Sequence, residues 1–366
     1  MKLHVRFIVH ISLAASLLSV AGLPSALMAQ SGDVASDALE SQAHATWSET
    51  MHHTSVPEKG CFHASYPNTQ WEGVECAEPP VNQSALPQLK SNEQTTGNGT
   101  DYIAQAPSGH LISAASGKFP AVVGVGSEQG VGVPLFNNAG ILGPNEYTLQ
   151  LNTNLVHTSA CGGFTNCRAW QQYLLASNAP VSLIDTSLTG NTEVYIEYWL
   201  IDYGANTSAT CPLGFLPAGA DATGPGVDCV QNTPAAVVYK GQLPITELAK
   251  LQLTGTATAN GLDIAVVTYG NDMYIASVGD FETAISSGWT QAEFNVFGND
   301  GGSEAVFSPG AFLEAQISLL YGSTSAPACI PPSSRAGTTG ESNNLTLASC
   351  STTGGPIPAL QFTESN

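Results

Sequence analysis

The sequence predicts an all-β protein, an antiparallel two-sheet β-sandwich with a poorly structured arm at its N-terminus. Hydrophobic residues make up 43% of the 366 residues and charged residues only 10%, so the chain can bury a sizeable core. Glycine occurs 37 times and proline 22 times, which is typical of many turns that join short strands. From about residue 101 onward, short β-branched and aromatic runs recur between turn residues, and this spacing favours a sandwich.

The first residues, 1–29, have the pattern of a secretory signal peptide. Lys2 and Arg6 form a positive end, the stretch 7–20 is apolar, and small residues follow, with cleavage sites at Ala21 and Ala29. The alternative is a membrane anchor, but the apolar run is short for a span of about 20 residues. We therefore expect a secreted product, extracellular or in the cell envelope, with no membrane segment after processing.

Residues 30–95 are rich in Ser, Gln, Glu and Pro and contain few apolar runs. This composition predicts a pro-segment or linker arm. Within the arm, the stretch from Cys61 to Cys76 has the size of a hairpin closed by a disulfide. The sandwich domain is then expected over residues 96–366.

The expected strands of the sandwich are short runs bounded by turn residues, and only the stretch 245–251 has a helical period. Asn-Gly at 260–261 and Gly-Asn-Asp at 270–272 predict hairpins. The glycine-rich stretch 124–132 precedes no helix and is interpreted as a loop. The expected strands are 119–126, 146–154, 169–176, 192–203, 235–241, 249–258, 262–270, 273–278, 290–298, 304–307, 311–322, 343–350 and 359–365.

All eight cysteines lie after the leader. An even number in an exported chain predicts four disulfides. The alternative, a zinc site, is disfavoured because the sequence contains no CxxC motif. We expect each cysteine to pair with its neighbour in the sequence, which gives the bonds Cys61–Cys76, Cys161–Cys167, Cys211–Cys229 and Cys329–Cys350.

The chain is strongly acidic, with 29 Asp and Glu residues against nine Lys and Arg residues, for a net charge of −20. It has no basic stripe, which excludes nucleic acid as a partner. The motifs GxSxG and HExxH, a P-loop and a dinucleotide fingerprint are absent, so we expect no metal and no cofactor. His110 and His157 are the only histidines of the expected sandwich, and its charge chemistry must therefore rest on carboxylates, amides and tyrosines.

Three expected strands carry polar and aromatic residues where a sandwich strand normally alternates cleanly. Side chains two positions apart share one face of a strand, so Gln171 lies with Tyr173, and Trp170 lies with Gln172. Together the three strands predict a groove on one sheet face for a substrate or a carbohydrate. Each residue taken alone could also be an ordinary solvent-facing side chain. The candidate residues are Gln171, Tyr173, Tyr195, Glu197, Trp199, Glu293 and Asn295.

At these residues the chain resembles the glutamic peptidases, the eqolisin family of secreted acid endopeptidases. Trp170-Gln171 resembles the Trp-Gln strand of the family, and Ala292-Glu293-Phe294 resembles its strand with a Glu between a small and an aromatic residue. The likeness spans about 145–320 and implies a jelly roll of concanavalin A-like type. The chain departs from the family at 149–154, where the family has a tryptophan-rich strand. Because Gln172 directly follows Gln171, the register of this strand is uncertain by one residue, and a shift of one residue would move the glutamine to the other face.

The resemblance implies a mechanism for peptide hydrolysis in acid. Glu293 would take a proton from water and return it to the leaving amine, while Gln171 would position the water and stabilise the oxyanion. The resemblance implies a polypeptide substrate as partner, and we expect the protein to be a monomer. The substrate-binding residues expected on the three strands are Trp170, Tyr173, Tyr195, Glu197, Trp199 and Asn295.

Two other functions stay open at this point. The sandwich could bind glycans or another extracellular ligand without catalysis, or it could be a structural protein of an envelope or matrix. A sandwich fold does not choose among them, because such folds host many functions. What discriminates is whether Gln171 and Glu293 face each other across one sheet.

Overall fold

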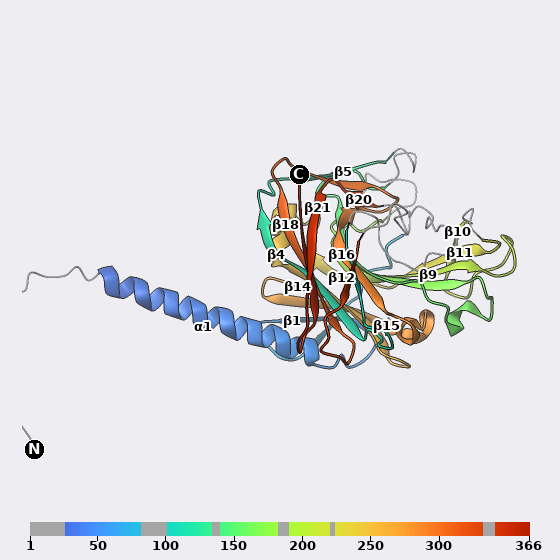
Figure 1. The fold of residues 1–366 in the computed structure, drawn as a ribbon, viewed down its shortest axis with the longest axis horizontal. Coiled ribbons are helices and arrows are strands. Elements are labelled where there is room, and N and C mark those ends of the chain that lie inside the picture. The colour runs from blue at the N-terminus through green and yellow to red at the C-terminus, as the bar shows by residue number, and fades with distance from the viewer. Residues whose placement is uncertain (1–25, 82–100, 134–139, 182–189, 220–223, 332–340) are drawn as a thin grey trace, which may run out of the picture. The chain divides into compact units, whose positions relative to one another are not determined.

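A computed structural model gives the fold of the chain. It describes residues 26–81, 101–133, 140–181, 190–219, 224–331 and 341–366 (Figure 1). The chain divides into two compact units, residues 1–46 and 47–366, and the second contains every described strand. Most of the expected signal peptide, residues 1–25, lies outside the described residues. Among the described helices, none is long and apolar enough to cross a membrane.

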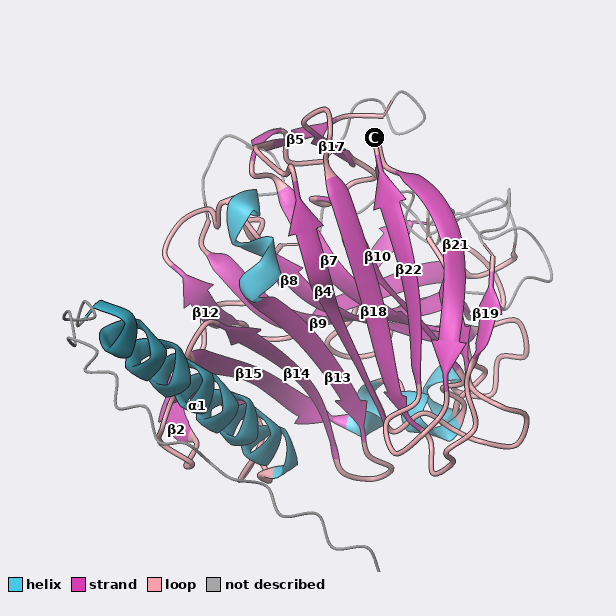
Figure 2. Cartoon of the chain, turned by 60° about the vertical axis from the view of Figure 1, so that its left-hand side comes forward, coloured by secondary structure: helices cyan, strands magenta, loops and turns pink. Residues whose placement is uncertain are grey.

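The first large sheet is antiparallel and joins segments from both ends of the second unit (Figure 2). The C-terminal strand β22 pairs with β18, which pairs with β4 from the start of the sandwich. The predicted hairpins form, and Asn260 adopts the positive φ of 57° in the turn between β13 and β14. In spatial order the strands are β2 (Glu72–Val74), β1 (Gly60–Ser65), β15 (Asp272–Gly279), β14 (Leu262–Tyr269), β13 (Leu251–Ala257), β4 (Ala114–Val123), β18 (Phe312–Leu320), β22 (Ala359–Ser365) and β21 (Thr346–Thr353).

The second large sheet is also antiparallel and packs on the first. Its order is β10 (Leu216–Gly219), β11 (Val227–Asn232), β9 (Thr192–Tyr203), β8 (Arg168–Ala176), β7 (Tyr147–Thr153), β16 (Gln291–Gly298), β3 (Ile103–Gln105) and β19 (Ala328–Ile330), with β12 (Ala236–Tyr239) also paired to β9. The predicted two-sheet β-sandwich is therefore confirmed.

The core lies between the two sheets, and two glycines of the first sheet make room for rings of the second. A Cβ on Gly117 of β4 would stand 2.1 Å from the ring of Phe294, and one on Gly255 of β13 would stand 2.3 Å from the ring of Tyr173. Phe294 and Tyr173 therefore point from the second sheet toward the first. Because side chains alternate along a strand, this fixes the direction of every neighbour on β16 and β8.

A third, small sheet lies beside β16. It consists of β20 (Ser342–Asn343), β17 (Glu304–Phe307), β5 (Glu128–Val131) and β6 (Gly143–Pro144). Strand β5 lies inside the stretch that the sequence analysis interpreted as a loop. The strands β3, β10, β11 and β19 were not predicted either, because they are short and their sequences show no clear alternation.

Four disulfides form, and they are the predicted neighbours, Cys61–Cys76, Cys161–Cys167, Cys211–Cys229 and Cys329–Cys350. No described cysteine is free. Four bonds of this kind indicate an oxidising environment of the extracellular type. The last of them joins β19 of the second sheet to β21 of the first.

Helix α1 (Ala26–His53) was not expected from the sequence. Its residues form no apolar stripe, so a search for helical periodicity does not detect the helix. The same residues include many good helix formers and no proline. The predicted helical stretch at 245–251 contains a short 3₁₀ helix, Ile245–Lys250. Further 3₁₀ turns are Ser159–Cys161, Asp280–Glu282 and Ile285–Ser287.

The hairpin closed by Cys61–Cys76 forms as predicted, but it is joined to the sandwich. Strand β1 pairs with β15 over its whole length, from Gly60 with Ser277 to Ser65 with Asp272. Trp47 and Met51, at the end of α1, pack with Phe62 in a small apolar cluster on the outer side of the first sheet. This part of the expected arm therefore extends the first sheet.

Candidate functional site

A row of polar side chains crosses four neighbouring strands of the second sheet. Glu293 of β16 stands opposite Asn152 of β7, which stands opposite Gln172 of β8, which stands opposite Glu197 of β9. Their strand neighbours Phe294, Leu151, Tyr173 and Ile196 all belong to the core between the sheets. The row, which we call the outer-face row, therefore lies on the face turned away from the first sheet.

Amide groups join three members of the outer-face row by hydrogen bonds. Asn152 Nδ2 donates to Glu293 Oε2 over 2.8 Å, and Gln172 Nε2 donates to Asn152 Oδ1 over 3.0 Å. Gln150 accepts from both amides through its Oε1, at 3.3 and 3.2 Å. Gln172 Oε1 is buried and has no hydrogen-bond partner among the described residues, so one acceptor of the row is unused within the described part of the chain.

A second carboxyl group lies beside Glu293. Asp101 precedes Ile103, which stands opposite Glu293, and alternation places Asp101 on the same face. Burial first, and then the neighbouring Glu293, raise the pKa of the Asp101 carboxyl well above its usual range. Asp101 is 1% exposed and Glu293 0%. Two neighbouring buried carboxyls cannot both ionise easily, because each negative charge disfavours the other and neither is solvated.

At the other end of the row, Glu197 lies among aromatic side chains. Trp199 Nε1 donates to Glu197 Oε1 over 2.7 Å, and the ring of Trp199 packs on that of Trp170 with a centroid distance of 6.4 Å. Burial, followed by the charge of Asp300, raises the pKa of Glu197 to about 8. In acid this carboxyl is therefore neutral.

More carboxyl–amide contacts lie around the row. Asn295 Nδ2 donates to Glu364 Oε2 over 3.1 Å, and burial raises the pKa of Glu364 to about 7. Burial, followed by Asp300, raises the pKa of Glu341 to about 8. The described basic residues make no ion pair with any of these groups, so protonation rather than a cation neutralises them.

The structure brings six of the eight predicted site residues to the outer face and leaves two elsewhere. Trp170, Trp199 and Tyr195 belong to apolar clusters on that face of β8 and β9. Alternation with core residues places Glu197, Glu293 and Asn295 on it as well, and the amide of Asn295 reaches Glu364 of β22 in the first sheet. Gln171 and Tyr173 instead point into the space between the sheets, so Gln171 does not face Glu293. The physical reason is the period of a strand: successive side chains point to opposite faces, so the next residue, Gln172, is the glutamine that belongs to the outer-face row.

Gln171 has its own set of partners between the sheets. Its Oε1 accepts a hydrogen bond of 2.7 Å from the hydroxyl of Thr283. The carboxyl of Asp263, which is 0% exposed, lies beside Gln171 and Asp280. Burial, followed by Asp280, raises the pKa of Asp263 to about 8. We call Gln171, Asp263, Asp280 and Thr283 the inter-sheet cluster.

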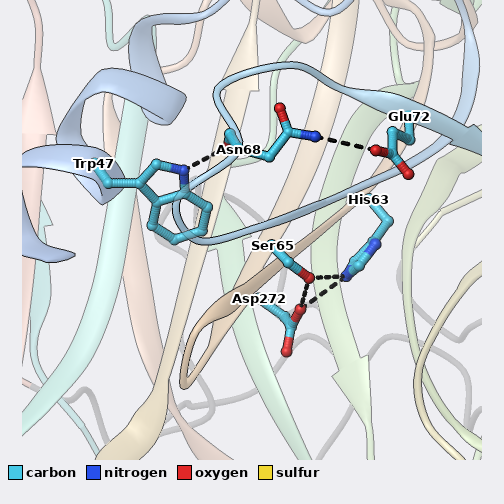
Figure 3. A network of polar contacts seen from close by, with 6 residues as sticks. All are labelled: Trp47, His63, Ser65, Asn68, Glu72 and Asp272. Atoms are coloured by element: carbon cyan, nitrogen blue, oxygen red, sulfur yellow. Dashed lines mark hydrogen bonds and ion pairs between the residues drawn. The ribbon is translucent and has the colours of Figure 1, made fainter.

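Figure 3 shows a Ser–His–Asp contact at the edge of the first sheet, and it is not a catalytic triad. Asp272 Oδ1 contacts His63 Nε2 at 2.9 Å and also accepts from the hydroxyl of Ser65, which lies 3.3 Å from the same Nε2. In a triad the carboxylate holds Nδ1, which leaves Nε2 free to take the proton of the serine. Here the carboxylate occupies Nε2, so the contact joins β1 to β15.

Asp101, Asn152 and Gln150 were missed by the sequence analysis. Gln150 and Asn152 alternate with Leu149 and Leu151, and such alternation of amides with leucines is the signal that could have found them. Asp101 precedes a strand too short to predict. Among the described residues, no group of three or more His, Cys, Asp or Glu side chains could hold a metal ion.

Comparison with known proteins gives no relative. No family model, no curated protein and no solved structure matches this chain.

Proposed function

We propose that the chain is an acid endopeptidase whose active site is the outer-face row, with Asp101 and Glu293 as its acid and base. The observation that carries the proposal is the chain of hydrogen-bonded amides, Gln172 to Asn152 to Glu293, which ends at a buried carboxyl with the buried carboxyl of Asp101 as its neighbour. The resemblance to glutamic peptidases supports it through Glu293 and through the order of the strands. Gln172 takes the place that the resemblance gave to Gln171.

The arrangement can activate water without a metal. Ionised Glu293 takes a proton from a water molecule, whose oxygen attacks the carbonyl carbon of a peptide bond. Protonated Asp101 donates a hydrogen bond to the carbonyl oxygen as it becomes negative. Gln172 Oε1 accepts a hydrogen bond from the attacking water. Glu293 then gives its proton to the leaving nitrogen, the C–N bond breaks, and a carboxylic acid and an amine result.

The pair sets an acidic working range. Asp101 must carry a proton while Glu293 has lost one, and this state is populated when one proton is shared by the two groups. The hydrogen bond from Asn152 favours the ionised form of Glu293, whereas burial favours the protonated form of Asp101. Activity should therefore fall at high pH, when the shared proton is lost.

The alternative of glycan binding through aromatic rings has less support. Trp170 and Trp199 are both 0% exposed, as is Glu293, so burial does not separate the two functions. What favours hydrolysis is that the row ends in two neighbouring carboxyls, Glu293 and Asp101, which stacking with a sugar does not need.

The test is incubation of the purified protein with an unfolded protein substrate between about pH 2 and 7. We expect internal cleavage with an optimum in acid that chelators leave unchanged. An optimum near neutrality, or a requirement for added metal, would rule out the two-carboxyl mechanism. The variant Glu293→Gln should abolish the cleavage, and its matched control, Glu75→Gln at an exposed residue, should not. This pair of results would assign the cleavage to the outer-face row.

A further inference from the structure

A segment near the N-terminus packs against the same outer face, beside the row. Ala77 N donates to Ala235 O over 2.9 Å, and Ala235 N donates to Ala77 O over 3.2 Å. Val81 N donates to Pro180 O over 3.0 Å, and Asn232 Nδ2 donates to Pro80 O over 2.9 Å. Every one of these contacts uses the main chain of residues 77–81, so the segment is held much as an extended peptide is held at the edge of a sheet.

The side chains of the segment dock in a regular way. Pro80 is buried and Ala77 is half-buried, whereas Glu78 and Pro79 between them are exposed. Anchors three residues apart match the three-residue turn of an extended polyproline helix. Prolines at 79 and 80 favour that conformation before binding, and they carry no N–H group that would need a partner.

The docking surface is continuous with the outer-face row. Ala77 packs against the apolar cluster formed by Leu174, Ala176, Ala179, Tyr195 and Ala235. Leu174 lies two positions from Gln172 on the same face of β8. Asn232, which holds the carbonyl of Pro80, stands opposite Glu197 and also hydrogen-bonds its carboxyl. The segment and the row thus share the amide of Asn232.

We propose that this surface is a binding subsite for an extended, proline-containing polypeptide, and that residues 77–81 occupy it as a built-in competitor. The subsite is formed by Leu174, Tyr195, Pro180, Asn232 and Ala235. The proposal rests on the proposed function only in that a polypeptide substrate would use this subsite. The subsite itself requires no catalysis. A tethered competitor acts at an effective concentration of about a millimolar, so free peptide must compete with it.

The test is binding of a fluorescent peptide to the full-length chain. The probe is N-acetylated, C-amidated Ala-Glu-Pro-Pro-Val with a label at its end, and the control peptide has Asp in place of Ala. The protein variant Ala77→Asp puts a carboxyl into the apolar contact with Leu174 and Tyr195 and should release the segment. Cys76 and β1 are unchanged. Glu78→Ala is the matched control, since Glu78 is exposed.

We expect Ala77→Asp to bind the alanine peptide at least tenfold more tightly than the wild type or Glu78→Ala, and to reject the aspartate peptide. Pro80→Asp, which releases the segment at its other anchor, should behave in the same way. Equal binding by all variants, or none by folded Ala77→Asp and Pro80→Asp, would overturn the proposal. Unfolding of both variants would also overturn it, because the segment would then be an essential part of the sandwich.

The outcome is separable from that of the proposed function. Peptide binding that the released variants gain, without hydrolysis by any variant, would keep the subsite and remove the peptidase. Hydrolysis of an unfolded protein by the wild type, without the gain in peptide binding, would keep the peptidase and remove the subsite.

Discussion

Gln171 and Gln172 are neighbours on β8, and each meets buried carboxyls, but on opposite sides of one sheet. Gln171 lies beside Asp263 and Asp280 between the sheets. Thr283 satisfies its carbonyl oxygen, whereas its Nε2 is buried without a hydrogen-bond partner among the described residues. Gln172 joins Asn152 and Glu293 on the outer face, and its own carbonyl oxygen has no partner among the described residues. Similar residue types thus form two clusters that differ in the face of the sheet on which they lie.

The surroundings separate the two clusters. Tyr173 and Tyr198 enclose the inter-sheet cluster within the main core, where a ligand would have to part the two sheets. The outer-face row lies on the other side of the second sheet, where a chain segment already docks at Leu174 and Tyr195. A buried carboxyl pair is therefore weak evidence of a site until its face is known. We assign chemistry to the row and stability to the inter-sheet cluster.

The largest expected effect is on hydrolysis by Glu293→Gln. The amide keeps the size of the carboxylate but cannot accept the proton of water, so turnover of an unfolded protein substrate should fall by about 10³-fold or more. Asp263→Asn, the matching change in the inter-sheet cluster, should leave turnover within a few-fold. The measurement is initial rate at the acid optimum. Equal losses in both variants would place the chemistry outside the row.

The next effect distinguishes the two glutamines. Gln172→Leu removes the acceptor for the attacking water and should lower turnover by about 10²-fold. Gln171→Leu should leave turnover nearly unchanged but destabilise the fold by about 1–3 kcal/mol, because the Thr283 hydroxyl loses its partner. Rates and denaturant midpoints of the two variants test this together. If Gln171→Leu were the less active variant, the assignment by face would be wrong.

The fold was predictable to the level of two packed antiparallel sheets because alternation and turn residues are local signals. Strand β9 agrees with its predicted range, and the four disulfides agree because each one closes a short loop. The pairing of β1 with β15 was not predictable, since these strands lie more than 200 residues apart in the sequence and nothing local records the contact.

The candidate site was predictable in its residue types but not in its register. Strand β8 is buried on both sides, from Ala169 to Ala176, so apolar and polar side chains occur on both faces and alternation cannot say which glutamine faces Glu293. Partners on other strands, Tyr173 over Gly255 and Gln172 beside Asn152, decide it. Asp101 could not be predicted as a site residue, because its position beside Glu293 depends on the pairing of β3 with β16.

A smaller effect concerns stability and pH. Because burial raises the pKa of Asp263 to about 8, the folded chain holds this proton after the unfolded chain has lost it near pH 4. Stability is therefore lost as pH rises from about 4 to 8, by roughly 1.4 kcal/mol per pH unit for such a group. Asp263→Asn should reduce this slope. Thermal unfolding midpoints at pH 4, 6 and 8 measure it.

The other buried carboxyls of the chain should add to the same slope. Burial raises the pKa of Glu128 to about 8 and that of Glu193 to about 7, as it does for Glu341 and Glu364. Wild-type protein should therefore be most stable in acid. A melting midpoint that rises from pH 4 to 8 would contradict the protonated state of these groups in the fold.

The smallest effect is expected from Glu197→Gln, at the far end of the row. At acid pH the Glu197 carboxyl is protonated, because its pKa is raised to about 8, and a glutamine has nearly the same shape and charge. Its oxygen can still accept the hydrogen bond from Trp199 Nε1. Turnover at the optimum should fall by less than about tenfold, which is 1.4 kcal/mol. The variant should also gain stability above pH 5, where the native carboxyl resists ionisation. A loss as large as that of Glu293→Gln, measured at the same pH, would mean that Glu197 rather than Asp101 partners the base, and would move the reacting centre along the row toward Trp199.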